Sequence, residues 1–166
     1  MWKVWLITIP LILAMICAAV CVALWKNMSS YWAAETSAAQ YVLDHTPISK
    51  LESYQVFTAS GVEDVFKGTD TFNHAWYAFY IPTEGTCYSI EANKLVTQKQ
   101  IADQMSKLHI HTQQCTIGYV TDQSAKFLHP TDDVVFEIHG TMKGKSTFVY
   151  LDAVTGRVLG KPTTID

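Results

Sequence analysis

The stretch Phe148-Val149-Tyr150-Leu151-Asp152-Ala153-Val154-Thr155-Gly156-Arg157-Val158-Leu159 predicts two antiparallel strands joined by a short turn. Its β-branched and aromatic residues favour strands at Thr147–Leu151 and Arg157–Leu159. Gly156 can take the positive φ that a G1 bulge demands. The chain therefore closes with a hairpin of a β-sheet.

One helix and two further strands precede this hairpin. Thr97 and Gln100 stand at capping-box spacing, and the apolar residues that follow recur at helical spacing, namely Ile101, Met105 and Leu108. Strands are expected at Cys115–Thr121 and Val134–His139, with Gly118 weakening the first. This part of the chain is a helix followed by an antiparallel sheet.

The same order occurs earlier in the chain. A helix with Ala34, Ala38, Tyr41 and Val42 on one face stops at His45-Thr46-Pro47, because proline pushes the preceding residue out of the helical region. Four expected strands follow, at Ser53–Ala59, Val62–Lys67, Asn73–Ile81 and Thr86–Glu91. The dense apolar run Trp76–Ile81 predicts a central strand that is covered on both faces.

The expected fold class is α+β, with two small units that each pack one helix on an antiparallel sheet. We place the first unit at residues 26–92 and the second at 93–166, with the boundary near Ala92-Asn93-Lys94. Each unit is near the lower size limit for a self-sufficient core, so we expect the two to pack against each other.

Residues Val4 to Leu24 carry no charged side chain. At about 1.5 Å of rise per residue, a helix of this length covers the ~30 Å hydrocarbon core of a bilayer. We therefore expect a transmembrane anchor at residues 4–25, with Trp2, Trp5 and Trp25 at the interfaces and residues 1–3 as a cytoplasmic tail.

A cleaved signal peptide is the competing interpretation of this segment. The apolar run exceeds the ~7–15 residues usual in signal peptides, and no clean Ala-x-Ala site follows it. A long C-terminal portion is translocated largely regardless of its charge. These features predict a single-pass cell-membrane protein with its N-terminus in the cytoplasm and its two domains outside the cell.

Charge excludes one class of partner. After Lys26 there are ten Lys and Arg against fifteen Asp and Glu, which leaves this portion with a net charge of −5. Nucleic acid needs a basic face, so we expect no nucleic-acid partner and contact with lipid only through the anchor.

The C-terminal strands resemble the closing strands of a PepSY-type domain. The resemblance rests on Val135-Phe136-Glu137-Ile138 and on the pattern Tyr-x-Asp-x-x-Thr-Gly-x-Val from Tyr150 to Val158. An anchor followed by two helix-plus-sheet units also resembles the TseB-like cell wall elongation regulators, also called YpmB-like proteins, over nearly all of the chain.

The resemblance implies a cystatin-like curl of sheet around one helix in each unit, the first being the TseB-like domain. It also implies a Gram-positive cell-surface protein that modulates peptidoglycan synthesis beside a penicillin-binding protein. It carries over no catalytic residue and no cofactor. The matched residues Phe136, Tyr150, Asp152 and Gly156 are scaffold: two aromatic core positions, a turn-capping carboxylate and a positive-φ glycine.

Candidate partner-binding residues lie in loops. The stretch Thr121–Asp133 is long for a hairpin and contains His129, Asp132 and Asp133, and Asn73 opens an aromatic strand. This long stretch is either an elaboration without consequence or part of a partner surface. The aromatic set Trp76, Tyr77, Phe79 and Tyr80 could line a peptide or glycan groove, although sheet-core packing is the simpler interpretation.

Chemical motifs give little support to an enzyme. No G-x-S-x-G, H-E-x-x-H, P-loop or G-x-G-x-x-G motif occurs. His109 and His111, with Asp103, His129 or His139 as further ligands, suggest a metal site only weakly. We interpret His109 instead as the solvated end of a helix, and we expect no metal.

The cysteines and carboxylates have equally plain interpretations. Cys115 with His111 lacks a third group that would orient the base, so we interpret Cys115 as a half-buried strand residue. A Cys87–Cys115 disulfide stays open, with two separate buried thiols as the simpler alternative. Asp132-Asp133 and Glu63-Asp64 are read as solvated turn residues.

Three hypotheses of function follow. The first is a non-catalytic regulator or scaffold of wall synthesis that binds a penicillin-binding protein. The second is a PepSY-type protease-inhibitory or propeptide-like module that acts in trans. The third is a hydrolase built on the His and carboxylate residues, which the missing motifs disfavour.

Overall fold

The structure of the chain is a computed structural model that describes residues 15–22, 35–59, 61–121 and 128–165. The chain divides into two compact units, Met1–Ser37 and Ala38–Asp166. In the first, the described residues 15–22 and 35–37 are helical. Most of the expected anchor at 4–25, and the whole tail at 1–3, lie outside the described residues.

The described part of the chain was also searched for a helix that could cross a membrane. None of its helices combines the necessary length with the necessary apolar character.

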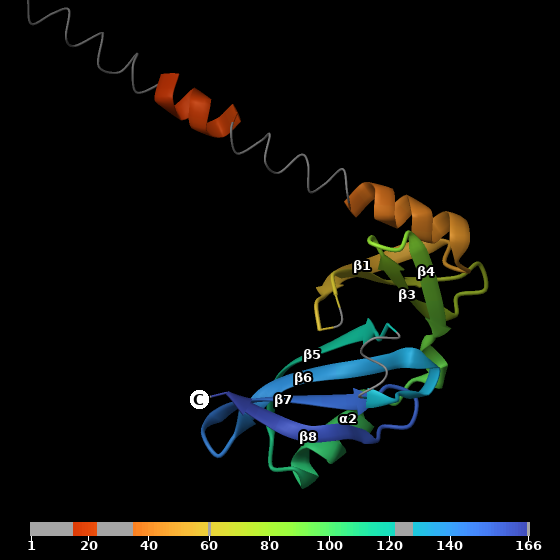
Figure 1. Cartoon of the computed structure of the whole chain (residues 1–166). Coiled ribbons are helices and arrows are strands. Elements are labelled where there is room, and N and C mark those ends of the chain that lie inside the picture. Colours follow the sequence, from red (N-terminus) through yellow and green to blue (C-terminus); the bar gives the residue numbers. More distant parts are fainter. Residues whose placement is uncertain (1–14, 23–34, 60, 122–127, 166) are drawn as a thin grey trace, which may run out of the picture. The chain divides into compact units, whose positions relative to one another are not determined.

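The unit Ala38–Asp166 begins with a helix on an antiparallel sheet. Its strands are β1 (Lys50–Phe57), β2 (Glu63–Thr69), β3 (Ala75–Ile81) and β4 (Thr86–Glu91), which pair in that order (Figure 1). Residues 38–45 are helical and bury Ala38 and Val42 against the sheet. The expected end of this helix is confirmed, because Thr46 donates both its N–H and its hydroxyl to the carbonyl of Val42.

Strand β3 is covered on both faces, as its dense apolar sequence predicts. Ala78 is fully buried in the cluster that includes Val42 and Phe66. Its neighbour Phe79 is fully buried in a different cluster on the opposite face, with Phe57 and Val65. Successive side chains of a strand point to opposite faces, so two buried neighbours require two covered faces.

A second helix and sheet follow the first. They comprise the 3₁₀ turn η1 (Ala92–Lys94), helix α2 (Gln98–Lys107), strand β5 (His111–Tyr119), the 3₁₀ turn η2 (Thr131–Asp133) and strands β6 (Val134–Met142), β7 (Lys145–Asp152) and β8 (Val158–Ile165). The strands pair antiparallel in the order β5-β6-β7-β8 (Figure 1). Two antiparallel sheets with few helices confirm the expected α+β class.

Helix α2 forms as its sequence predicts. The Thr97 hydroxyl accepts the N–H of Gln100, and the Gln100 side chain accepts the N–H of Thr97, which completes a capping box. Ile101 and Met105 are buried one turn apart. They pack on the sheet face formed by Ile138, Val149 and Leu151.

The two sheets repeat one packing device. In each, a buried isoleucine precedes the first strand, namely Ile48 before β1 and Ile110 before β5. The second strand of the sheet, β2 or β6, passes next to this isoleucine at a glycine. A Cβ at Gly68 or at Gly140 would overlap this isoleucine and the backbone after it. Glycine is therefore required wherever the incoming segment passes over the second strand.

One hydrophobic core joins the two sheets. Phe57, Val65, Phe79 and Ile90 of the first sheet share a cluster with Ile117 of β5 and with residues of β6 and the closing strands. Gly118 allows this contact, because a Cβ there would overlap the ring of Phe57. The buried carboxylate of Glu63 accepts the N–H of Tyr119 at 2.8 Å and so ties β2 to β5.

The closing turn confirms the roles expected of Asp152 and Gly156. Asp152 is fully buried and accepts hydrogen bonds from the N–H groups of Val154, Thr155 and Thr131 and from the Thr131 hydroxyl. Burial by itself raises the pKa of Asp152, but these hydrogen bonds outweigh it and the pKa is lowered. Gly156 has a φ of 72°.

The other two scaffold residues are less buried than expected. Phe136 and Tyr150 are half-buried and pack against the margins of the core clusters. Tyr150 lies on the strand face opposite α2, where its hydroxyl donates to Glu137 at 2.7 Å.

Several strands run beyond their predicted bounds, β6 for example to Met142 rather than His139, and the largest extensions are in β5 and β8. β5 begins at His111 rather than Cys115, and β8 runs to Ile165 rather than Leu159. The added residues are mostly exposed and polar, including Gln113, Gln114 and Thr163. Each of these strands is an edge strand with solvent beside it, so apolar alternation does not mark its full length.

Candidate binding groove

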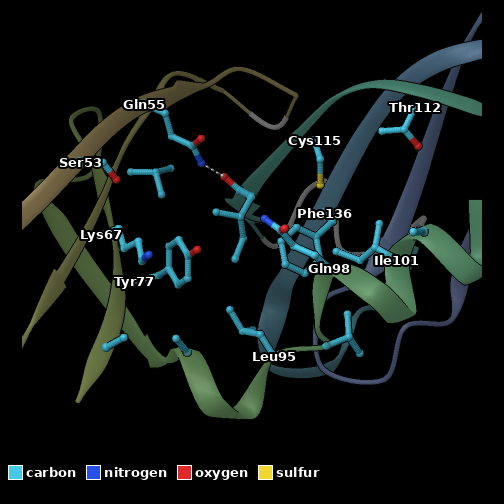
Figure 2. Close-up of a pocket in the computed structure, with 16 residues that line it drawn as sticks. Ser53, Gln55, Lys67, Tyr77, Leu95, Gln98, Ile101, Thr112, Cys115 and Phe136 are labelled. Carbon is cyan, nitrogen blue, oxygen red and sulfur yellow. Dashed lines mark hydrogen bonds between the residues drawn. The ribbon is translucent and has the colours of Figure 1, made fainter. Parts of the chain in front are cut away.

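A groove of about 480 Å³ opens between the first sheet and helix α2 (Figure 2). Its lining comes from strands β1, β2 and β3, the segment 92–98, helix α2 and strands β5 and β6. The lining residues are Ser53, Gln55, Val65, Lys67, Ala75, Tyr77, Ala92, Leu95, Val96, Gln98, Ile101, Ala102, Thr112, Cys115, Ile117 and Phe136. The volume falls in the ~300–1,000 Å³ range of ligand sites.

One wall of the groove is the face of the first sheet that turns away from its helix. Along β2 this face carries Glu63, Val65 and Lys67, and only the first two are buried. The inner end of the face is covered by β5 through the shared core. Its outer end, with Lys67 and Tyr77, is left uncovered and becomes the wall.

The opposite wall is built by helix α2 and the segment before it. The N–H of Val96 donates to the carbonyl of Ala153 at 2.9 Å, which fixes this segment to the closing turn. Leu95 and Val96 are half-buried, and Gln98 and Ala102 are exposed on the groove side of α2. Figure 2 shows Phe136 and Ile101 facing Tyr77 and Lys67 across the opening.

The groove is mostly apolar and carries one charged side chain, that of Lys67. The Lys67 ammonium lies 3.9 Å from a carboxylate oxygen of Glu52, and both side chains are about two-fifths exposed. An exposed pair at this distance contributes at most ~1 kcal/mol, so Lys67 can exchange Glu52 for another carboxylate at little cost.

Two groups of the groove, the Cys115 thiol and the Tyr77 hydroxyl, have pKa values shifted away from ionisation at neutral pH. Burial raises the pKa of the Cys115 thiol to about 11. Burial, with a smaller contribution from Cys115, raises the pKa of Tyr77. The thiolate is the nucleophilic form of cysteine, so the groove holds a thiol of low reactivity.

The interpretation of Cys115 as a half-buried residue was wrong, because its side chain is exposed. Helix α2 packs over Ile138, Val149 and Leu151 and leaves the edge strand β5 uncovered at this point. The thiol lies in a hollow, where surrounding protein displaces water without closing over the side chain. Exposure and a raised pKa therefore coexist at Cys115.

The two cysteines beyond the N-terminal unit are separate free thiols. Cys87 is half-buried beside the hydrophobic cluster that contains Ala38 and Val42, and its thiol donates to the carbonyl of Tyr88. Burial raises the pKa of Cys87 to about 11 as well. His111, the proposed base for Cys115, is not among the groove residues.

Asn73 lies in the turn between β2 and β3, outside the groove lining. It adopts a left-handed φ of 65° and donates its N–H to the carbonyl of Asp70. Asp70 organises the turn by accepting the N–H groups of Phe72 and His74 and the indole N–H of Trp76. Desolvation raises the pKa of Asp70 but these bonds, with the charge of His74, lower it overall.

His129, Asp132 and Asp133 lie in the segment that leads into β6. All three have left-handed φ angles, between 47° and 56°. Asp132 and Asp133 line a second hollow, of about 360 Å³, beside the stacked rings of Tyr88 and Tyr119. The structure thus brings these two aspartates to one hollow and places Asn73 elsewhere.

The aromatic set of β3 has mixed roles. Tyr77 lines the groove and Phe79 belongs to the shared core. Trp76 donates to Asp70, and Tyr80 packs beside Tyr41. One of the four residues therefore supports the groove interpretation, and the other three serve the fold.

The histidines are dispersed over the described elements. His109 follows α2 with a φ of 55°, and His139 contacts the carboxylate of Glu137. In the part of the chain that the structure describes, no group of three His, Cys, Asp or Glu residues could hold a metal ion.

Sequence reasoning offered Tyr77 as a possible groove residue but did not identify the rest of the lining, although a signal was present. In β1 and β2 the positions of one face change from apolar to polar along the strand, from Phe57 to Gln55 and Ser53 and from Val65 to Lys67. Such a change indicates where a covered sheet face becomes an open wall.

Comparison with known proteins gives a relation at the level of fold. No protein-family model matches the chain, and no curated protein matches it. Among solved structures, the YpmB protein from Bacillus subtilis is similar with a TM-score of 0.63 and 19% sequence identity, over 78% of this chain and 96% of that one. The chain therefore has a YpmB-like fold.

Proposed function

We propose that this chain is a membrane-anchored extracellular binding protein that regulates or scaffolds peptidoglycan synthesis through contact with a penicillin-binding protein. The observation that carries the proposal is the likeness of its fold to the YpmB protein, which extends over 96% of that structure. The resemblance of the whole element order to TseB-like cell wall elongation regulators supports the same conclusion.

The character of the groove supports binding rather than chemistry. Its surface is mostly apolar, the cation among its described residues is loosely paired, and its thiol has a pKa of about 11. A site of this kind offers contact area and a point of charge recognition. It supplies no activated nucleophile.

The proposal is tested by photo-crosslinking of the tagged full-length chain in its own host cells. A photoreactive amino acid replaces Gln98 at the groove, His129 in the segment before β6, or Asn73 in the β2–β3 turn, all of which are exposed. Lys143, exposed at the β6–β7 turn, is the matched control position. Adducts are identified by mass spectrometry.

Recovery of a penicillin-binding protein from one of the three probe positions, and not from Lys143, is the expected result. Recovery of secreted proteases in its place would favour the inhibitor hypothesis. A complete absence of synthase adducts, with all four variants expressed at the wild-type level, would refute the proposed function.

A further inference from the structure

The outer edge of β5 turns backbone hydrogen-bonding groups toward the groove. The carbonyl of Ile117 accepts the side-chain amide of Gln55 at 3.2 Å, and the N–H of Tyr119 donates to Glu63 at 2.8 Å. Both partners belong to the first sheet, on the side of β5 away from β6. Ile117 and Tyr119 therefore direct their N–H and C=O groups outward.

The backbone N–H and C=O groups of Cys115 point in the same direction as those of Ile117 and Tyr119. In an antiparallel pair, residues alternate between those bonded to the neighbouring strand and those directed away from it. The pairing of β5 with β6 is regular from Cys115 to Tyr119, since its register shift lies before Cys115, between Thr112 and Gln114. Cys115 thus turns its N–H and C=O away from β6, at a point where it lines the groove.

We propose that the groove binds an extended peptide segment of a partner protein, which adds to the edge of β5 at Cys115 and places a carboxylate beside Lys67. This inference rests on the proposed function, because it names how the protein partner is held. Strand addition takes its affinity from main-chain hydrogen bonds and its specificity from pockets for alternate side chains.

Charge complementarity favours a carboxylate in the occupant. Among the described residues of the lining, Lys67 alone is charged, and its present partner Glu52 lies at 3.9 Å with both side chains substantially exposed. None of these described lining residues is acidic. An incoming carboxylate would therefore meet one cation and no opposing anion among the lining residues.

The apolar lining residues of the groove suit alternate side chains of a strand. Side chains of an added strand point by turns toward the two faces of the sheet, so every second residue would enter the groove. There it would meet Val65, Tyr77, Ile101 and Phe136. Residues between these would face solvent, so the occupant needs apolar residues only at alternate positions.

The other edge of the same sheet, strand β8, carries features that hinder strand addition. β8 carries Gly160 with a φ of 72° and Pro162, and its pairing shifts register between Phe148 and Tyr150. Proline and bulges are among the features that protect edges from pairing. The stretch Cys115–Ile117 contains neither, and the register shift of β5 lies before it, between Thr112 and Gln114.

The test starts from a library of random linear peptides displayed on phage. The library is selected on the full-length chain in lipid nanodiscs and depleted on the same chain with Ala102→Trp, which fills the groove from α2. Ser106→Trp is the matched control, because Ser106 is exposed one turn further along α2 and does not line the groove. We expect peptides that bind wild type and Ser106→Trp but not Ala102→Trp.

The binding mode is then read from the selected peptide itself. Methylation of one backbone nitrogen at a time removes one donor at a time. We expect affinity to fall about tenfold at every second position and little at the positions between, because a lost hydrogen bond of ~1.4 kcal/mol corresponds to a factor of ten. Amide exchange at Cys115 should slow when the peptide binds.

Variants at two positions separate the backbone contact from the charge contact. Cys115→Pro removes the outward N–H without removing a bond to β6, and Cys115→Ala keeps that N–H, so only the first should abolish binding. Lys67→Gln should weaken peptides that contain Asp or Glu up to about fivefold and leave neutral peptides unaffected. If Cys115→Pro fails to fold, the methylation series decides the mode alone.

Three results would overturn the inference. The selection could yield no peptide that binds wild type but not Ala102→Trp, or the affinities in the methylation series could fail to alternate along the peptide. The groove could also bind a fatty acid while the selection yields no peptide. The proposed function fails separately. If Ala102→Trp leaves the crosslink to a penicillin-binding protein unchanged, the regulator survives and the groove is not its docking site.

Discussion

At the residue scale, the buried carboxylate of Asp152 holds the end of the fold together. Its two oxygens accept bonds from the closing turn on one side and from Thr131, before β6, on the other. The residue therefore joins two segments that are distant in the sequence. Removing its charge affects both at once.

We expect Asp152→Asn to lower the free energy of unfolding by about 2–3 kcal/mol at pH 7, because the amide presents a donor to N–H groups that need an acceptor. The folded pKa of Asp152 lies below its unfolded value. Its stabilisation is therefore complete above the unfolded pKa of ~3.9 and is lost as pH falls through the folded pKa. Urea unfolding between pH 7 and pH 3 measures both effects.

The difference in the free energy of unfolding between wild type and Asp152→Asn should stay constant near neutral pH and become smaller in acid. Asp103→Asn, at an exposed position of α2, is the matched control and should change stability little. A gap that widened as the pH fell would contradict the hydrogen-bonding role assigned to the ionised Asp152.

The thiol of Cys115 provides a second test at this scale. Its pKa of about 11 predicts slow alkylation at neutral pH despite its exposure. The rate should rise about tenfold per pH unit up to pH ~10, whereas an ordinary thiol with a pKa near 8.5 levels off above pH ~9. Iodoacetamide labelling of the Cys115 peptide, followed by mass spectrometry, measures the profile. A plateau at pH 9 would contradict the raised pKa.

At the scale of elements, helix α2 depends on its first turn. We expect Thr97→Ala to cost about 1 kcal/mol, because it removes the acceptor for the N–H of Gln100 from the capping box. Thr97→Ser keeps the hydroxyl and should retain most of the stability. Thermal unfolding of the two variants distinguishes loss of the cap from loss of the methyl group.

Elements with buried faces could be predicted from the sequence, and the exposed polar ends of β5 and β8 could not. Residues such as Ile101 and Met105, or Ala78 and Phe79, reveal their periodicity because water is excluded from them. The outer residues of β5 and β8 are polar and hold their place through backbone pairing, which leaves no pattern in side-chain type. These parts of β5 and β8 were therefore not predicted, whereas the edge strand β4 was predicted at its observed bounds, Thr86–Glu91.

The candidate site was less predictable, because it is formed by residues from separate elements. Lys67, Tyr77 and Cys115 each have an ordinary place in a strand, and only the packing of the second sheet brings them to one groove. Loop composition directed attention to Asn73, His129, Asp132 and Asp133 instead. Their role as partner contacts stays a prediction.

At the scale of the whole molecule, the two sheets share a core that passes through Gly118. We expect Gly118→Ala to cost about 2–3 kcal/mol, because its Cβ would overlap the Phe57 ring, although alanine suits a strand better than glycine does. Amide exchange should accelerate in both sheets together, since the contact belongs to both.

Phe57→Leu provides the matched background for this prediction. A smaller side chain at position 57 leaves room for the new Cβ, so Gly118→Ala should cost less there than in wild type. Equal costs in the two backgrounds would show that the ring is not the obstacle, and exchange confined to β5–β8 would show that the sheets open independently.

The bond between Glu63 and the N–H of Tyr119 spans 56 residues of chain, whereas every strand pairs with its immediate neighbour in sequence. Local contacts form faster than distant ones. As the chain emerges with its N-terminal end first, the first sheet can therefore assemble before β5 is available, and it must wait with the apolar face around Phe57 and Phe79 uncovered. That interval, rather than the finished fold, is when this chain is most exposed to aggregation.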